Sequence, residues 1–398
     1  MLVRSLLALS LSSLIFSSTF AENSSTQQLA QIPETKAVPI EHVPLSQPVT
    51  VQKENSEDLV NDPTLQPTQT SAGAEPSVAS DTTSTTNIPA EPTAPAAPVE
   101  WTLDALNNAQ WSENLPRGYF PVYAKAQVLL NRSHVSPGAI DGATGMNTLK
   151  ALSAFQTMNK LEGAGALTQE TWDALNTKHS QPVFVEYTIT AQDLKGPYVK
   201  AIPASAAERA KLKALSYTRV TEMLGEKFHM DEGFLKKINP KASFSKEGEK
   251  IIVANISNKL PEDIHLIIAH KSAKQLYLFN SKNRMIAAFP ATVGKEGTPS
   301  PTGTLKISNI APNPWYSYNP TTFGQAPGQT YSIAPGPNNY VGNMWIGLSR
   351  PSFGIHGTPE PSNISTGTGS NGCVRLTNWD ANNLSKHVKV GTMVRFLE

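Results

Sequence analysis

The residues best suited to chemistry are a single cysteine and a histidine that precedes it by seventeen positions. Cys373 is the only cysteine among 398 residues, and His356 lies in the sequence Gly-Ile-His-Gly. A thiol becomes a strong nucleophile when a neighbouring imidazole accepts its proton. The pair therefore predicts a nucleophile, Cys373, with His356 as its general base.

The backbone beside the cysteine predicts a second part of the same chemistry. Gly372 precedes Cys373 in a stretch rich in Gly, Ser and Thr, and small residues let backbone N–H groups face a reacting carbonyl. We expect the N–H groups of Gly372 and Cys373 to form an oxyanion hole. Composition alone leaves another interpretation open, in which the thiol is a structural residue of a glycine-rich loop.

The first residues of the chain predict export. Residues 1–21 contain Arg4, an apolar run from Leu6 to Phe16, and small residues before Glu22, which is the pattern of a cleaved signal peptide. An uncleaved membrane anchor is the alternative, but the apolar run is shorter than the roughly 20 residues that a spanning helix needs. One cysteine permits no internal disulfide, so the exported chain must be stabilised by hydrophobic cores.

Charge and motif content argue against two classes of protein. The 33 basic and 32 acidic residues nearly cancel, so no bulk field attracts nucleic acid and we expect no nucleic-acid partner. The sequence has neither a His-Glu-x-x-His motif nor a cluster of cysteines. We therefore predict no metal site and no cofactor.

Changes in composition and periodicity divide the chain into segments and predict a multidomain protein. The linker is rich in Pro and Thr and contains no Phe, Trp or Tyr, so it cannot bury a core and should be disordered. The predicted segments are a signal peptide (1–21), that linker (22–100), a small three-helix module (101–180), a mixed α/β segment (181–260) and a mainly β domain (261–398).

Hydrophobic periodicity predicts the elements inside these segments. Thr168 should cap the last helix of the module, since it stands just before an apolar run. The β domain shows apolar runs separated by Gly, Pro and Asn turns. The expected helices lie near 123–131, 144–158, 168–176, 206–215, 221–228, 231–238 and 377–388.

The β domain resembles the YkuD-type L,D-transpeptidases of bacterial cell walls from about Ile264 to Phe396. The motifs that carry the resemblance are Ile355-His-Gly-Thr358, Ser370-Asn-Gly-Cys-Val-Arg375, Thr298-Pro-Ser-Pro-Thr-Gly-Thr304, Gly336-Pro-Asn-Asn339 and Thr377-Asn-Trp-Asp380. The resemblance implies a catalytic domain of the β-sandwich type. It also implies that the Cys373 thiolate attacks the diaminopimelate carbonyl of a tetrapeptide stem, releases D-Ala and passes the acyl group to an amine.

The same resemblance leaves the acceptor open. It can be another diaminopimelate amine, which gives a 3-3 cross-link, a lipoprotein lysine, or water, which would make the protein an L,D-carboxypeptidase. Carbapenem β-lactams are implied as acylating inhibitors. The implied substrate-positioning residues are Gly357, Thr358, Ser370, Asn371 and Arg375.

Two of these positions carry alternatives of their own. Many family members have His directly before the Gly-Cys pair, whereas this chain has Asn371, which cannot carry a proton. That departure supports a rival hypothesis, a non-catalytic peptidoglycan-binding protein. Arg375 suits a stem carboxylate because its guanidinium is a planar fork, but an internal salt bridge would use it equally well.

Two further resemblances point to the cell wall. About 55 residues of the helical module resemble a peptidoglycan-binding domain, and the run Thr221-Glu-Met-Leu-Gly-Glu-Lys-Phe228, Phe234-Leu-Lys-Lys-Ile-Asn-Pro240, Gly248-Glu-Lys-Ile-Ile-Val253 looks like a degenerate LysM module. They imply stem peptides and glycan as partners. With the signal peptide, they predict an exported protein of the periplasm, associated with the cell wall.

Overall fold

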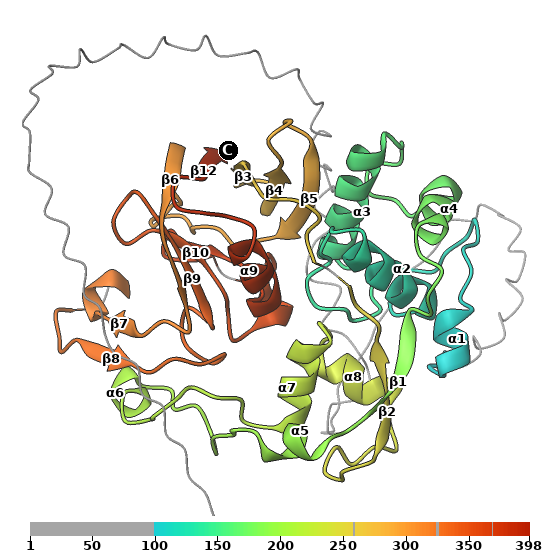
Figure 1. Ribbon diagram of the computed structural model, residues 1–398, viewed down its shortest axis with the longest axis horizontal. Helices are drawn as coiled ribbons and strands as arrows, with labels where there is room; N and C mark the ends of the chain where they lie inside the picture. Colours follow the sequence, from blue (N-terminus) through green and yellow to red (C-terminus); the bar gives the residue numbers. More distant parts are fainter. Residues whose placement is uncertain (1–98, 258, 324–325, 368) are drawn as a thin grey trace, which may run out of the picture. The chain divides into compact units, whose positions relative to one another are not determined.

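The computed structural model describes residues 99–257, 259–323, 326–367 and 369–398 (Figure 1). The predicted signal peptide and nearly all of the predicted linker, residues 1–98, lie outside the described residues. Across the part of the chain that the structure describes, no helix is long and apolar enough to cross a bilayer.

The helical module forms as predicted, with one additional helix at its start. The Thr168 hydroxyl accepts the Thr171 N–H at 3.2 Å, so the predicted N-cap is confirmed. The helices are α1 (Leu103–Asn107), α2 (Pro121–Arg132), α3 (Met146–Asn159) and α4 (Gln169–Thr177). The three predicted helices correspond to α2, α3 and α4, and α1 is the one that periodicity missed.

The middle segment pairs two strands across an insertion of short helices. Strands β1 and β2 are antiparallel, and the predicted helix pair is present as α7 and α8. The predicted helix 206–215 is wrong in length: the helix ends at Arg209, and the Leu215 N–H donates to Pro335 O at 2.8 Å instead of to a helical carbonyl. The elements are β1 (Phe184–Thr188), α5 (Ala191–Lys195), α6 (Ala206–Arg209), α7 (Val220–Lys227), α8 (Glu232–Ile238) and β2 (Lys250–Ala254).

One hydrophobic core serves both the helical module and the middle segment. Leu129 and Phe155 of the helices pack in the same buried cluster as Phe184, Leu235 and Val253 of the strands and the helix pair. The predicted boundary near residue 180 therefore marks a change in sequence pattern, while the segments on either side share one hydrophobic core. The LysM-like resemblance of the middle segment stays a prediction.

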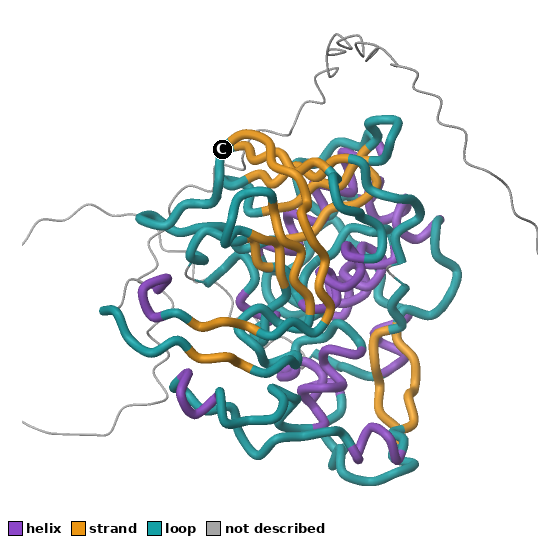
Figure 2. The backbone as a smooth tube through the Cα atoms, turned by 60° about the vertical axis from the view of Figure 1, so that its left-hand side comes forward, coloured by secondary structure: helices purple, strands orange, loops and turns teal. Residues whose placement is uncertain are grey.

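The C-terminal domain is built on one curled eight-stranded sheet, which confirms the mainly β prediction (Figures 1 and 2). Its strand order is β11-β10-β9-β6-β12-β3-β4-β5. The strands are β3 (Leu266–His270), β4 (Gln275–Phe279), β5 (Met285–Pro290), β6 (Gly303–Pro312), β9 (Met344–Leu348), β10 (Gly354–His356), β11 (Val374–Arg375) and β12 (Met393–Leu397).

Strand β6 joins the two halves of this sheet. Its residues 303–306 pair with β12 and its residues 307–312 pair with β9, with an irregular register between Ile307 and Asn309. Such an irregularity bends a strand and increases its twist. The expected two layers of a sandwich thus arise as parts of one continuous sheet.

Smaller elements complete the domain. Helix α9 (Asn378–Ser385) is shorter than the predicted 377–388 and begins after Thr377, whose hydroxyl accepts the Asp380 N–H at 3.2 Å. A separate antiparallel hairpin, which the sequence did not predict, pairs β7 with β8. The remaining elements are β7 (Tyr316–Tyr318), η1 (Pro320–Phe323), β8 (Tyr331–Ile333) and η2 (Pro361–Asn363).

A buried arginine joins the helical module to the middle segment, and its removal should destabilise both. Arg132 is 7% exposed and donates to the carbonyls of Asn255 at 2.8 Å, Gln181 at 2.9 Å and Pro182 at 2.5 Å. We predict that Arg132→Met lowers the free energy of unfolding by about 2–4 kcal/mol, because buried carbonyls lose charge-assisted donors. The midpoint of urea unfolding measures this.

A surface variant provides the control for that measurement. Lys250 and Glu186 lie 3.4 Å apart with both side chains more than half exposed, so Lys250→Ala should cost less than about 1 kcal/mol. An Arg132→Met midpoint that coincides with that of Lys250→Ala would contradict the role assigned to Arg132.

Candidate active site

The predicted nucleophile and base lie on neighbouring strands of the sheet. Strand β10 runs parallel to β11, with Ile355 opposite Val374 and His356 opposite Arg375. Cys373 directly precedes β11. On the other edge of β10, His356 stands opposite Trp345 of β9. Two strands that are distant in sequence thus bring the cysteine and the histidine into one site.

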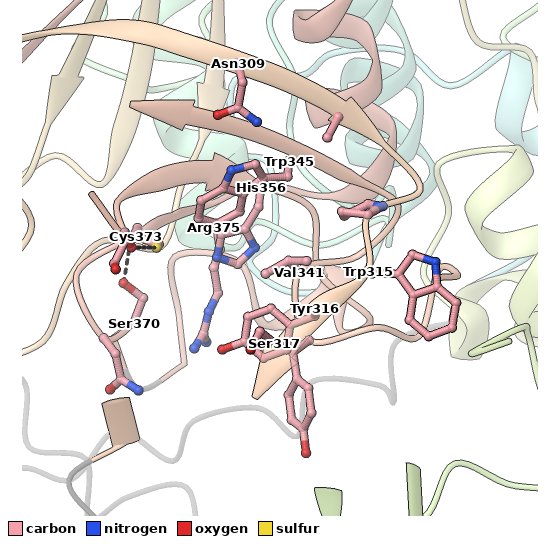
Figure 3. A pocket seen from close by; sticks show the side chains of 15 residues that line it. Asn309, Trp315, Tyr316, Ser317, Val341, Trp345, His356, Ser370, Cys373 and Arg375 are labelled. Atoms are coloured by element: carbon pink, nitrogen blue, oxygen red, sulfur yellow. Dashed lines mark hydrogen bonds between the residues drawn. The ribbon is translucent and has the colours of Figure 1, made fainter. Parts of the chain in front are cut away.

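A cavity of about 460 Å³ opens over this part of the sheet (Figure 3). It contains five of the residues that the sequence singled out, namely Ser370, Asn371, Cys373, Arg375 and His356. The full lining consists of Asn309, Ala311, Pro314, Trp315, Tyr316, Ser317, Tyr340, Val341, Trp345, Ser352, His356, Ser370, Asn371, Cys373 and Arg375.

The surroundings of His356 make it a neutral imidazole with a defined tautomer. Its side chain is buried, and Nδ1 lies 2.7 Å from the carbonyl oxygen of Gly357. A carbonyl only accepts, so Nδ1 carries the proton and Nε2 presents a lone pair. Burial lowers the pKa of His356 to about 4, although the Gly357 hydrogen bond raises it and the charge of Arg375 lowers it further. His356 is therefore uncharged and able to accept a proton at neutral pH.

The histidine ring is also held in place by an indole. The ring of Trp345 stacks on it at 5.8 Å between centroids and 19° between planes. Gly354 leaves room for that indole, since a Cβ there would lie 2.6 Å from the Trp345 ring. The orientation of His356 is thus fixed by a hydrogen bond on one side and a stacked ring on the other.

Cys373 is a neutral thiol in the resting state. Its sulfur lies 3.6 Å from the Ser352 carbonyl oxygen, to which the S–H donates. Burial raises the pKa of Cys373, although the Gly354 backbone and the positive charge of Arg375 lower it in part. With His356 also neutral, the pair rests as thiol and imidazole rather than as thiolate and imidazolium.

The turn before the cysteine requires a glycine and a buried serine. Gly372 has φ +102°, and a Cβ there would lie 2.7 Å from a Phe353 ring carbon. The Ser370 hydroxyl accepts the Gly372 N–H at 3.1 Å and donates to the carbonyl of Cys373. This small network fixes the direction in which Cys373 enters the pocket.

Two parts of the chain are similar to known protein families. The family model described as "L,D-transpeptidase catalytic domain" matches residues 264–395, and the model "Putative peptidoglycan binding domain" matches residues 123–175. A protein named "Putative L,D-transpeptidase YkuD" from Bacillus licheniformis is 32% identical over 37% of this chain and 73% of its own length. The protein of the same name from Bacillus subtilis is 31% identical over 37% of this chain and 74% of its own length.

The chain belongs to the YkuD family of L,D-transpeptidases. A solved L,D-transpeptidase from Mycobacterium smegmatis is also similar, at 18% identity and a TM-score of 0.28 over 38% of this chain. The chain spans 64% of the length of that protein. The two matched regions lie inside the predicted β domain and the predicted helical module.

Two predicted positioning residues of this L,D-transpeptidase lie outside the cavity lining. Gly357 acts through its carbonyl, which binds His356, and it packs so closely on Asn378 that a Cβ would lie 2.2 Å from Oδ1. The buried Thr358 accepts the Glu360 N–H at 3.3 Å. A direct contact of either residue with substrate stays a prediction.

Arg375 is the one lining residue of this transpeptidase that carries a fixed charge. Among the described residues, the ion pairs within 4.0 Å do not include Arg375. A contact of Arg375 with a carboxylate of the stem peptide stays a prediction.

Sequence reasoning missed the aromatic wall of the transpeptidase pocket. Trp315 and Tyr316 enter it from the start of the β7–β8 hairpin, and Tyr340 follows the quoted motif 336–339. The Arg209 guanidinium of the middle segment lies 4.4 Å from the Tyr340 ring centroid. The density of aromatic residues in Asn-Pro-Trp-Tyr-Ser-Tyr was the available signal.

The neutral resting pair predicts the pH dependence of Cys373 alkylation. Because the pKa of Cys373 is raised, the thiol stays protonated at neutral pH, and its rate of reaction with iodoacetamide should rise about tenfold per pH unit above pH 7. Mass spectrometry of the single alkylated cysteine measures the rate.

The His356→Ala variant is the comparison for the alkylation profile. With a neutral pair, loss of the imidazole should leave the shape of the profile nearly unchanged. A plateau of fast alkylation between pH 5 and 8 that disappears in His356→Ala would indicate a thiolate–imidazolium pair and contradict the assignment.

Proposed function

We propose that this L,D-transpeptidase acts on tetrapeptide stems of peptidoglycan through an acyl-thioester on Cys373, with His356 moving the protons. The observation that supports this most directly is the tautomer of His356. Its Nδ1–H is fixed on Gly357, so Nε2 is available to a thiol in the same pocket. Both halves of the reaction require a neutral imidazole that can accept one proton and return it.

The first half-reaction forms the thioester. The S–H turns from the Ser352 carbonyl to Nε2 of His356 and gives up its proton while the sulfur bonds to the diaminopimelate carbonyl carbon. The tetrahedral intermediate then breaks its C–N bond, and the D-Ala amine leaves with the proton from His356. A low imidazole pKa favours that return, because the imidazolium is a strong acid.

The second half-reaction transfers the acyl group to an amine. The acceptor nitrogen attacks the thioester carbonyl and passes a proton to His356, and the departing sulfur of Cys373 takes it back. We propose a diaminopimelate side-chain amine as acceptor, which yields a 3-3 cross-link. A lipoprotein lysine or water follows the same steps, and water would give L,D-carboxypeptidase activity.

The oxyanion of both intermediates is assigned to the backbone at Gly372 and Cys373. In the resting structure the Gly372 N–H donates to the Ser370 hydroxyl. We propose that this N–H turns toward the oxyanion, which binds more strongly than a neutral hydroxyl. Arg375 is proposed to hold a carboxylate of the stem.

The remaining partners and the location belong to the same proposal. The peptidoglycan-binding module and the LysM-like segment would hold the wall polymer, and the predicted signal peptide would send the chain to the periplasm. Carbapenems are proposed to acylate Cys373, since their strained amide offers the thiol a reactive carbonyl.

Two substitutions test the catalytic pair. We predict that Cys373→Ser and His356→Ala each lower turnover of tetrapeptide muropeptides by about a thousandfold or more, because nucleophile and base act as one unit. Mass spectrometry resolves cross-linked dimers, amine-exchange products and trimmed tripeptides. Unchanged thermal melting confirms that the variants fold, and turnover near that of the wild type in either variant would refute the pair.

Asn371 supports the rival function of a wall-binding protein without catalysis, and one variant separates the two. Asn371 lines the pocket, so in an active enzyme Asn371→Ala should lower the rate by about tenfold, the effect of one lost hydrogen bond. If the wild type forms no product and Cys373 takes no carbapenem adduct, the binding function stands instead.

A further inference from the structure

An exposed tryptophan forms one end of the catalytic pocket. Trp315 is 65% exposed although it lines the cavity, and it follows Pro314 just before β7. Tryptophan is a large apolar residue that is mostly buried on average. An indole left open at the rim of a pocket is therefore an available apolar surface within a ligand site.

The positions of Trp315 and the nucleophile give the pocket a direction. Figure 3 shows Trp315 and Cys373 at opposite ends of the drawn cavity, with Tyr316 and His356 between them. The Cys373 thiol and the charged Arg375 side chain thus both lie toward the end of the cavity away from Trp315. A bound stem peptide that reacts at Cys373 can extend along the pocket toward Trp315.

The substrate supplies a group for that end, an argument that rests on the proposed function. In a tetrapeptide stem that ends in D-Ala, two residues separate the reacting diaminopimelate from the sugar. Three extended residues span at most about 10 Å. The glycan to which the stem is attached is therefore the group that a bound donor can present at the rim of the pocket when its diaminopimelate carbonyl is at Cys373.

The chemistry of the rim fits a neutral sugar. Apart from Arg375 and the neutral His356, the cavity is lined by uncharged residues, so the Trp315 end offers no fixed charge to an ionic group. A hexose ring has one face of C–H groups and a rim of hydroxyls. A flat indole can cover such a face and its N–H can donate to the hydroxyl rim, and the exposed Ser317 adds a hydroxyl to the same cavity lining.

We propose that Trp315 is the platform of a saccharide subsite, which binds the N-acetylated sugar that carries the donor stem peptide. The subsite belongs to the catalytic domain and is separate from the peptidoglycan-binding module. It makes the enzyme select donors that are still attached to glycan over free peptides.

Two donors and three variants test this subsite. The donors are a disaccharide-tetrapeptide and the same tetrapeptide without sugar, and kcat and KM are measured for both. Trp315→Ala should lower kcat/KM for the disaccharide donor about five- to tenfold more than for the free peptide, mainly through KM, since a stacked aromatic contact is worth roughly one kcal/mol. Trp315→Phe should retain most of the preference.

Val390→Ala is the matched control, because Val390 is 64% exposed and lies outside the cavity lining. It should leave both donors unaffected. Equal losses on the two donors in Trp315→Ala would overturn the proposal and assign Trp315 to peptide binding or to the shape of the hairpin. Wild-type enzyme that shows no preference for the disaccharide donor would overturn it as well.

A binding measurement keeps this test distinct from the proposed function. Saturation-transfer NMR with the disaccharide alone reports sugar contact without any turnover. Because the peptidoglycan-binding module can also contact the sugar, the signal is compared between variants. If the wild type proves inactive on both donors, a disaccharide signal that is weaker in Trp315→Ala than in Val390→Ala still supports the subsite. Signals of equal strength in these two variants reject it.

Discussion

The catalytic geometry depends on the parallel pairing of the two-residue strand β11 with β10. So short a strand holds its place because both edges are bonded: the Leu376 N–H donates to His356 O at 2.8 Å, and Thr292 exchanges backbone hydrogen bonds with Arg375 on the other side. Parallel strands need a long crossover. The connection from β10 to β11 ends at Cys373, so the proposed nucleophile is positioned by the sheet.

The support for His356 extends into the middle segment. Gly357, whose carbonyl fixes the imidazole, packs on Asn378 at the start of α9, and the Asn378 amide donates to Glu226 of α7 at 2.9 Å. Burial raises the pKa of Glu226 to about 8, so this carboxyl is largely protonated at neutral pH. The middle segment therefore supports the proposed base through a hydrogen bond to a carboxyl group that is largely uncharged at neutral pH.

Local signals explain how much of this could be predicted. The reactive pair followed from a single thiol in a chain predicted to be exported and from its motif, and Thr168 followed from capping chemistry. Trp345 could not be predicted as a partner of His356, because its place depends on β9 lying between β10 and β6. The predicted helix 206–215 failed for a similar reason, since Leu215 bonds to Pro335, 120 positions away. In both cases a contact far along the chain decided the outcome, which periodicity does not report.

The neutral resting pair is also compatible with Asn371 at the position where the family resemblance leads us to expect histidine. An imidazole whose pKa is about 4 is a weak base but becomes a strong acid once protonated, so in the proposed mechanism it holds the thiol proton only while the carbon–sulfur bond forms. A single such group can both remove the proton and deliver it to the leaving amine. The side chain at position 371 then has to orient the reacting groups by hydrogen bonding and does not have to carry a proton. The amide of Asn371 can do this at every pH.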